Sequence, residues 1–211
     1  MTIFDRILRR RFDSRAYWQA RYADGGNSGG GSYGASAAFK ANSLNCFIAE
    51  HRIDRMLELG SGDGNQAALL EVNAYLGLDI SPDAVDIARL RNADLPGRDF
   101  RVYDPQLDVV VDASAPLVVS MDVILHLIEP EVYDAYMRTL VACSTRYVGI
   151  YSTATEQQPR LMLSHNRYRD HRPWLAEHHP TAREIRVDMV GSAFEIHPDT
   201  GFFYYDLRPG D

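Results

Sequence analysis

A glycine-rich turn and two carboxylates are spaced as a nucleotide-type ligand would require. Residues 56–65 read MLELGSGDGN, in which Glu58 precedes a GxGxG turn that begins at Gly60. Glycine lets a backbone approach a ligand closely and adopt positive φ. Asp79 ends the next apolar run, where a carboxylate can accept both hydrogens of a ribose diol. We therefore expect the ligand to lie at this turn.

The pattern around the turn departs from that of a dinucleotide site. The fingerprint of such sites is GxGxxG, whereas this turn is GxGxG. Glu58 would repel a pyrophosphate and would suit a cationic ligand. These features favour a ligand with a sulfonium and an amino-acid group over a nicotinamide dinucleotide, although a nicotinamide oxidoreductase stays as a rival interpretation.

Asp122 and His126 follow the fourth predicted strand with i, i+4 spacing. In a helical turn this spacing places both side chains on one face. A histidine near its ordinary pKa can act as a general base, and Asp122 could orient its imidazole. The alternative is that His126 packs in the interior beside Leu127.

A second polar group follows the fifth predicted strand, on the same ligand side of the sheet. His165, Arg167 and Arg169 supply donors that suit sugar hydroxyls or an acidic acceptor, and a solvated polar segment is the alternative. Together with Asp122 and His126, His165 could also hold a divalent cation. Magnesium prefers oxygen ligands, so Asp122 is its first candidate and the ligand set stays open.

The elements that would position these residues alternate between strand and helix. We expect helices at 3–21, 35–51, 65–72, 82–91 and 129–142, shorter ones around 160–166 and 173–178, and strands at 55–59, 74–80, 99–103, 116–123, 146–151, 183–190 and 201–207. Ser81 and Pro82 suit the start of a helix. The order predicts an α/β fold, a Rossmann-like, doubly wound, mostly parallel sheet with a C-terminal antiparallel hairpin.

The organisation of the chain is predicted to be a single domain over residues 1–211. Residues 1–51 would form N-terminal helices and a Gly-rich loop, 24–34, which reads DGGNSGGGSYG. This loop is either a linker or a lid that closes over the ligand, with Tyr33 as a substrate-binding donor. Residues 52–211 would form the ligand-binding core, with an acceptor-site insert around 154–182.

The segments MLELGSGDG (56–64), YLGLDIS (75–81), FRVYD (100–104) and SMDVILHL (120–127) resemble class I S-adenosylmethionine-dependent methyltransferases. The resemblance implies that this cofactor binds the turn, with Glu58 facing its amino group and Asp79 its ribose. Asp104 would face the adenine. The other cofactor contacts that it implies are Gly60, Ser61, Gly62, Ile80 and Met121.

A narrower resemblance runs through residues 25–45, 61–66, 122–140 and 165–175. These segments are similar to small bacterial methyltransferases of glycan and polysaccharide biosynthesis, a group that includes mycobacterial mannoside O-methyltransferases. The resemblance implies in-line transfer of a methyl group to a sugar hydroxyl, assisted by a histidine base, by a divalent cation such as magnesium, or by both. An N- or O-methyltransferase of another metabolite and a non-catalytic cofactor-binding subunit are the alternatives.

Composition excludes several other classes. The 211 residues carry 22 Lys and Arg against 29 Asp and Glu, a net charge of −7, which disfavours nucleic acid as a partner. No apolar run approaches the roughly 18–20 residues of a membrane span, and the charged N-terminus does not suit a secretory signal. Two separated cysteines, Cys46 and Cys143, fit a reducing cytoplasm. The oligomeric state stays open.

Overall fold

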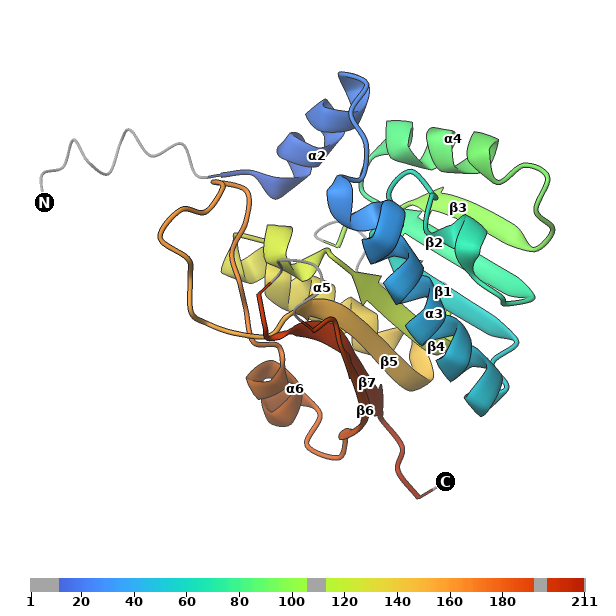
Figure 1. Cartoon of the computed structure of the whole chain (residues 1–211), viewed down its shortest axis with the longest axis vertical. Coiled ribbons are helices and arrows are strands. Elements are labelled where there is room, and N and C mark those ends of the chain that lie inside the picture. The colour runs from blue at the N-terminus through green and yellow to red at the C-terminus, as the bar shows by residue number, and fades with distance from the viewer. Residues whose placement is uncertain (1–11, 106–112, 192–196, 211) are drawn as a thin grey trace, which may run out of the picture.

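The computed structural model describes residues 12–105, 113–191 and 197–210, and its centre is a seven-stranded sheet. The strand order is β3-β2-β1-β4-β5-β7-β6 (Figure 1). The five strands β1 to β5 run parallel, while β7 is antiparallel to both of its neighbours. The strands are Arg55–Leu59 (β1), Ala74–Asp79 (β2), Arg98–Val102 (β3), Ala115–Met121 (β4), Ser144–Thr153 (β5), Arg183–Met189 (β6) and Thr200–Asp206 (β7).

Helices cover both faces of the sheet and so bury its two apolar sides. In Figure 1, α3 crosses in front of the sheet and α5 lies behind it. Residues of α3 and α4 share one apolar core with the sheet, and residues of α5 and α6 share the other. The helices are Ser14–Ala23 (α2), Gly34–His51 (α3), Pro82–Arg91 (α4), Pro130–Ala142 (α5) and Arg172–His178 (α6). None of the described helices is both long and apolar enough to cross a membrane.

The alternation of side chains along the strands sets these two cores and the position of the first acid. Met56 of β1 joins the core under α3, whereas Leu57 and Leu59 join the core under α5. Successive residues of a strand point to opposite faces. Glu58 therefore shares the α3 face with Met56, at the end of the strand where the glycine turn begins.

The strand order and the mostly parallel strands confirm the predicted fold class. The start of α4 lies where the local sequence signals predicted it. Ser81 is its N-cap, and the Ser81 Oγ accepts a hydrogen bond from the Ala84 amide at 3.3 Å. Pro82 occupies the first helical position. This local chemistry fixes where the chain leaves β2, and it holds the end of that strand, with Asp79, at the ligand side of the sheet.

Two expected helices are wrong. Residues 65–72 form a single 3-10 turn, Ala67–Leu69, because the chain is held by side-chain bonds: Asn65 Nδ2 donates to the Ser32 carbonyl and Gln66 Nε2 to the Ala37 carbonyl. Residues 160–166 contain no helix. Of the helix expected at 3–21, residues 3–11 lie outside the described residues, and α2 begins at Ser14.

Candidate active site

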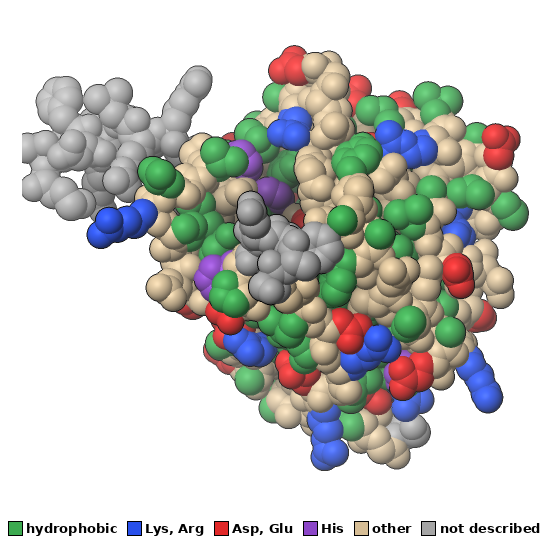
Figure 2. All heavy atoms as spheres, in the orientation of Figure 1, with side chains coloured by type: hydrophobic (Ala, Val, Ile, Leu, Met, Phe, Trp, Pro, Cys, Tyr) green, Lys and Arg blue, Asp and Glu red, His purple; other side chains and the backbone are tan. Residues whose placement is uncertain are grey.

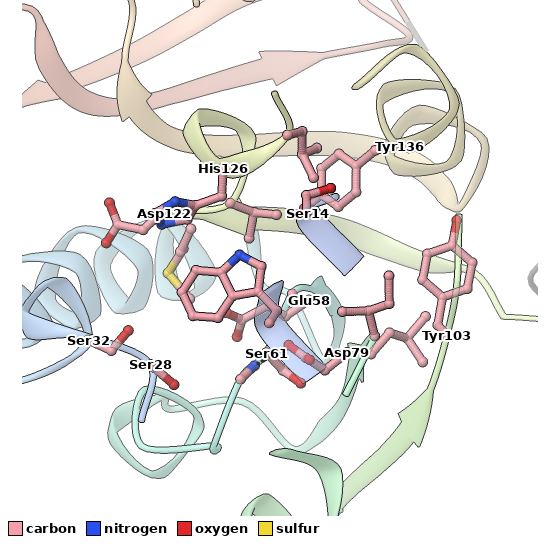
Figure 3. Close-up of a pocket in the computed structure, with 18 of the residues that line it drawn as sticks. Ser14, Ser28, Ser32, Glu58, Ser61, Asp79, Tyr103, Asp122, His126 and Tyr136 are labelled. Carbon is pink, nitrogen blue, oxygen red and sulfur yellow. Dashed lines mark hydrogen bonds between the residues drawn. The ribbon is translucent and has the colours of Figure 1, made fainter. Parts of the chain in front are cut away.

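A pocket opens at the carboxyl ends of the parallel strands. It is lined by the ends of β1, β2 and β4, by α2 and by the Gly-rich loop (Figure 3). Figure 3 shows Asp122 and His126 on one side of the pocket and Asp79 and Tyr103 on the other. Seven of the eight residues expected to contact a cofactor line it, namely Glu58, Gly60, Ser61, Gly62, Asp79, Ile80 and Met121.

The glycine turn is a tight cradle. Gly60 and Gly62 both have positive φ, at 79° and 54°. A Cβ at Gly60 would collide with Val123, and one at Gly62 would collide with Ser28. Ser61 lies between them, and its buried Oγ has no hydrogen-bond partner among the described residues. A buried hydroxyl without a partner is costly, so the cradle is built to receive a polar group.

Asp79 and Glu58 bring two buried carboxyls to this cradle. Asp79 accepts hydrogen bonds from the amides of Gly62, at 2.8 Å, and Ser81, at 2.9 Å. Glu58 accepts one from the hydroxyl of Tyr75 at 2.6 Å. Burial raises the pKa of Asp79 to about 6 and that of Glu58 to about 7, although these hydrogen bonds oppose the increase.

The Gly-rich loop lies over the glycine turn. Ser28 Oγ accepts a hydrogen bond from the Asp63 amide at 3.0 Å and is 2.8 Å from the Tyr22 hydroxyl of α2. Tyr33 donates its hydroxyl to the buried Asp63 carboxylate, which also pairs with Arg91 at 2.8 Å. Tyr33 therefore lies outside the pocket lining and ties the loop down, while Ser28 and Ser32 line the pocket.

His126 lines the pocket on the side away from Asp79. Its Nδ1 lies 3.0 Å from the carbonyl oxygen of His165. A carbonyl only accepts, so Nδ1 carries the proton of the neutral ring and Nε2 keeps its lone pair. Burial lowers the pKa of His126, against opposing contributions from the His165 carbonyl, Asp122 and Asn166, so the ring is neutral near pH 7.

The ring of His165 is placed beside that of His126 rather than in the pocket lining. The two imidazole centroids are 5.6 Å apart, and His165 stacks on Tyr17 of α2 at 4.7 Å. Trp18, the next residue of α2, meets His126 edge-on at 4.8 Å. Helix α2 is further tied down by its Ser14 amide, which donates to Glu129 Oε1 at 2.8 Å. These contacts close one side of the pocket.

Asp122 lies next to His126 in the pocket but has a different partner. Asp122 directly follows the last residue of β4, and its backbone is left-handed, with φ of 58°. The Asp122 Oδ2 accepts a hydrogen bond from Lys40 Nζ at 2.7 Å, and the expected helical turn is instead the 3-10 turn Ile124–His126. The carboxylate is therefore held by α3 rather than by the imidazole.

The remaining expected residues lie at the margins. Arg169 donates to the carbonyls of Leu127 and Ile128 and lies over Tyr133, so it braces the chain behind His126. Arg167 is exposed. Asp104 is buried and pairs with Arg15 of α2 at 2.6 Å. Neither Arg167 nor Arg169 lines the pocket.

No role was assigned to Lys40 or Trp18 from the sequence. Both line the pocket. The signal for Lys40 was present, because it is the only lysine of the chain.

In the described part of the chain, no three His, Cys, Asp or Glu side chains are grouped to hold a metal ion. Acidic and basic side chains are mixed over the face shown in Figure 2.

Comparisons with known proteins give a matching family model and similar solved structures. Residues 57–142 match the family model described as a methyltransferase domain. No curated protein sequence matches the chain significantly. Among solved structures, the chain is similar to the N-methyltransferase NodS from Bradyrhizobium japonicum, with a TM-score of 0.71 and 11% identity over 92% of this chain and 98% of that one.

Two further solved structures share the fold. Magnesium protoporphyrin IX methyltransferase from Synechocystis, with bound S-adenosylmethionine, has a TM-score of 0.67 and 15% identity, covering 94% of this chain and 99% of that one. A phosphoethanolamine N-methyltransferase from Haemonchus contortus has a TM-score of 0.64 and 10% identity, covering 94% and 49%.

The residues of the pocket fit the cofactor of such enzymes. The glycine cradle with its partnerless Ser61 hydroxyl faces the two acids Glu58 and Asp79, which suit an ammonium and a ribose diol. The matched domain spans the turn, both of these acids and the end of β4. The chain is an S-adenosylmethionine-dependent methyltransferase with the class I fold.

Proposed function

We propose that this enzyme transfers a methyl group to a hydroxyl of a sugar or oligosaccharide, with mannosides as the first candidates, and that His126 is the general base. The observation that carries the proposal is the tautomer of His126. Its Nδ1 is engaged by the His165 carbonyl at 3.0 Å, so Nε2 is the basic atom, and the residue lines the pocket. His165 thus contributes through its backbone.

The cofactor would lie along the strand ends, from Asp104 to Asp122. Asp104 would face the adenine, Asp79 the ribose, and Glu58 the amino group, while Gly60, Ser61, Gly62, Ile80 and Met121 would form the floor of the site. When bound, the cofactor supplies an electrophilic methyl group on a sulfonium. The lining residues would hold this methyl near His126, on the side of the pocket opposite Asp79.

His126 would accept the proton of the acceptor hydroxyl as its oxygen attacks the methyl group. A sugar hydroxyl is a weak nucleophile, and a base of near-neutral pKa helps it most at pH 7. Because burial keeps the ring neutral, Nε2 is ready to take this proton. Helix α2 and the Gly-rich loop would exclude water from the reaction.

The donor set does not fit a role for magnesium in this step. Asp122 is the only carboxylate beside His126 in the pocket lining as described, and Lys40 already neutralises it at 2.7 Å. Magnesium is bound mainly through oxygen ligands. We therefore assign deprotonation to His126 alone, with Arg167 and Tyr33 as outer contacts of a larger acceptor.

A small amine is the second candidate acceptor, favoured by the neutral ring of His126 in the pocket lining and by the similar structures. Two of the similar structures are N-methyltransferases, one of them solved with phosphoethanolamine. The same neutral His126 would then take the proton of the amine.

The test begins with calorimetric binding of S-adenosylhomocysteine, for which we expect a micromolar dissociation constant, roughly −8 kcal/mol. Methyl transfer from labelled cofactor is then screened over mannosides, other glycans and small amines. His126→Ala should lower turnover by roughly 10²–10⁴-fold with cofactor affinity nearly unchanged. His165→Ala, which keeps the carbonyl, is the matched control and should retain most activity. Full turnover by His126→Ala would contradict the proposed base.

A further inference from the structure

The position of the single lysine of this chain is unusual. Lys40 is the only lysine among 22 basic residues, and it lies in the middle of α3 with 1% of its surface exposed. It lines the pocket. Burying an ammonium costs free energy unless the charge is paired. All remaining Lys or Arg positions of the chain hold arginine. This contrast indicates that the compact ammonium of lysine, and not a guanidinium, is required at position 40.

The surroundings of Lys40 leave part of its ammonium for a ligand. Asp122 Oδ2 accepts one hydrogen at 2.7 Å, and the ring of Tyr151 lies 5.1 Å from Nζ. An ammonium has three hydrogens to donate. Arg15 also lines the pocket, but it is 42% exposed and paired with Asp104. Within the described lining, Lys40 is therefore the buried cation.

Glu58 is the buried anion that accompanies it. Glu58 is 2% exposed and lies on the face of the sheet that α3 covers; burial raises its pKa, and the charge of Lys40 opposes this increase. A buried carboxylate and a buried ammonium on one wall match the ammonium and carboxylate of an α-amino acid. The glycine cradle between Gly60 and Gly62 lies beside both groups in the same pocket.

We propose that Lys40 binds the α-carboxylate of the cofactor's methionine portion while it keeps its bond to Asp122. The inference rests on the cofactor placement of the proposed function. It makes Lys40 a determinant of cofactor specificity, because a ligand without the carboxylate would lose this contact. It also links the cofactor-binding side of the pocket to the side that holds Asp122 and His126, because the cofactor carboxylate and Asp122 would share one ammonium.

The test compares two ligands by calorimetry: S-adenosylhomocysteine, and its decarboxylated analogue S-adenosyl-3-thiopropylamine, which lacks only the carboxylate. The wild type should prefer the first by about tenfold or more, the effect of one charge-assisted hydrogen bond. Lys40→Met should erase this preference by weakening the first ligand and leaving the second within about twofold. Equal weakening of both ligands, or of neither, would overturn the inference.

Two further variants make the result specific. Glu58→Gln should weaken both ligands equally, because both contain the amine, and so should keep their ratio. Lys40→Met/Asp122→Asn removes both members of the ion pair and avoids an unpaired buried charge, so it serves if Lys40→Met alone does not fold by circular dichroism. It should show the same loss of preference. A wild type that binds neither ligand would instead refute the proposed cofactor placement.

Discussion

Gly31 of the Gly-rich loop faces the carboxylate of Asp122 so closely that a Cβ there would lie 2.6 Å from Oδ2. Gly31→Ala should therefore displace the loop or the Asp122–Lys40 pair. We expect weaker binding of S-adenosylhomocysteine and a lower melting temperature. Gly30→Ala is the matched control, because a Cβ at Gly30 has no atom within 4 Å. Identical behaviour of the two variants in calorimetry and thermal melts would contradict the close approach.

Tyr33→Phe tests whether the loop is a lid. The variant removes the hydroxyl that donates to Asp63, and it should cost roughly 1 kcal/mol of loop closure. Limited proteolysis should cut residues 25–33 faster in the variant than in the wild type. Bound S-adenosylhomocysteine should protect the loop in the wild type. Cleavage that the ligand leaves unaffected would favour a simple linker.

The raised pKa of Glu58 predicts how cofactor binding depends on pH. Burial raises this pKa from 4.5 to about 7, so ionisation of Glu58 opposes folding of the free protein. The protonated carboxyl of Glu58 therefore contributes fully to the stability of the free protein below pH 4.5, and this contribution is lost as the pH rises through 7. A bound ammonium needs the ionised form, so affinity for S-adenosylhomocysteine should rise between pH 6 and 8. Glu58→Gln should flatten this profile; a flat wild-type profile would refute the assignment.

His171 predicts a separate pH effect on stability. It is fully buried, with Nδ1 3.3 Å from Ser152 Oγ and Nε2 3.0 Å from the Tyr205 hydroxyl, and burial lowers its pKa to about 4. The neutral ring stabilises the fold above its unfolded pKa of about 6.5. This contribution, of the order of 3 kcal/mol, is lost as the pH falls from 6.5 to 4.

The measurement is urea unfolding between pH 7 and pH 4.5. His171→Gln removes the titrating group, so its stability should fall less steeply with acid than that of the wild type. His178, which is partly exposed and stacks on Trp174, provides the control substitution His178→Gln, whose profile should follow the wild type. Parallel profiles for all three proteins would show that His171 does not set the acid limit.

The parallel sheet was predictable because its signals are local. The strand before the glycine turn, the Ser81 cap and Pro82 each act within a few residues, and all were found where expected. Glu58, the glycine turn, Asp79 and Ile80 lie close together in the sequence, around β1 and the end of β2, and Met121 ends β4. Because the parallel strands bring these ends to one edge of the sheet, the seven expected cofactor residues named above line the pocket.

The rest of the site depends on contacts across long stretches of sequence. Residues 65–72 have the composition of a helix, but bonds to Ser32 and Ala37 override it. The i, i+4 spacing of Asp122 and His126 suggested a shared helical face, but φ of 58° at Asp122 turns its carboxylate towards Lys40. The partners Ser32, Ala37 and Lys40 lie far away in the sequence, so local sequence patterns do not reveal these contacts.

The cover of the pocket is synthesised before the sheet that it covers. Helix α2 and the Gly-rich loop precede every described strand in the sequence, yet Ser14 must reach Glu129, 115 residues later, and Tyr17 must reach His165. Such distant contacts form late, because the loop-closure entropy must first be offset by the structure between them. The pocket cover can therefore be fastened only after the chain through His165 has been synthesised, and until then the strand ends that line the ligand site lack these contacts.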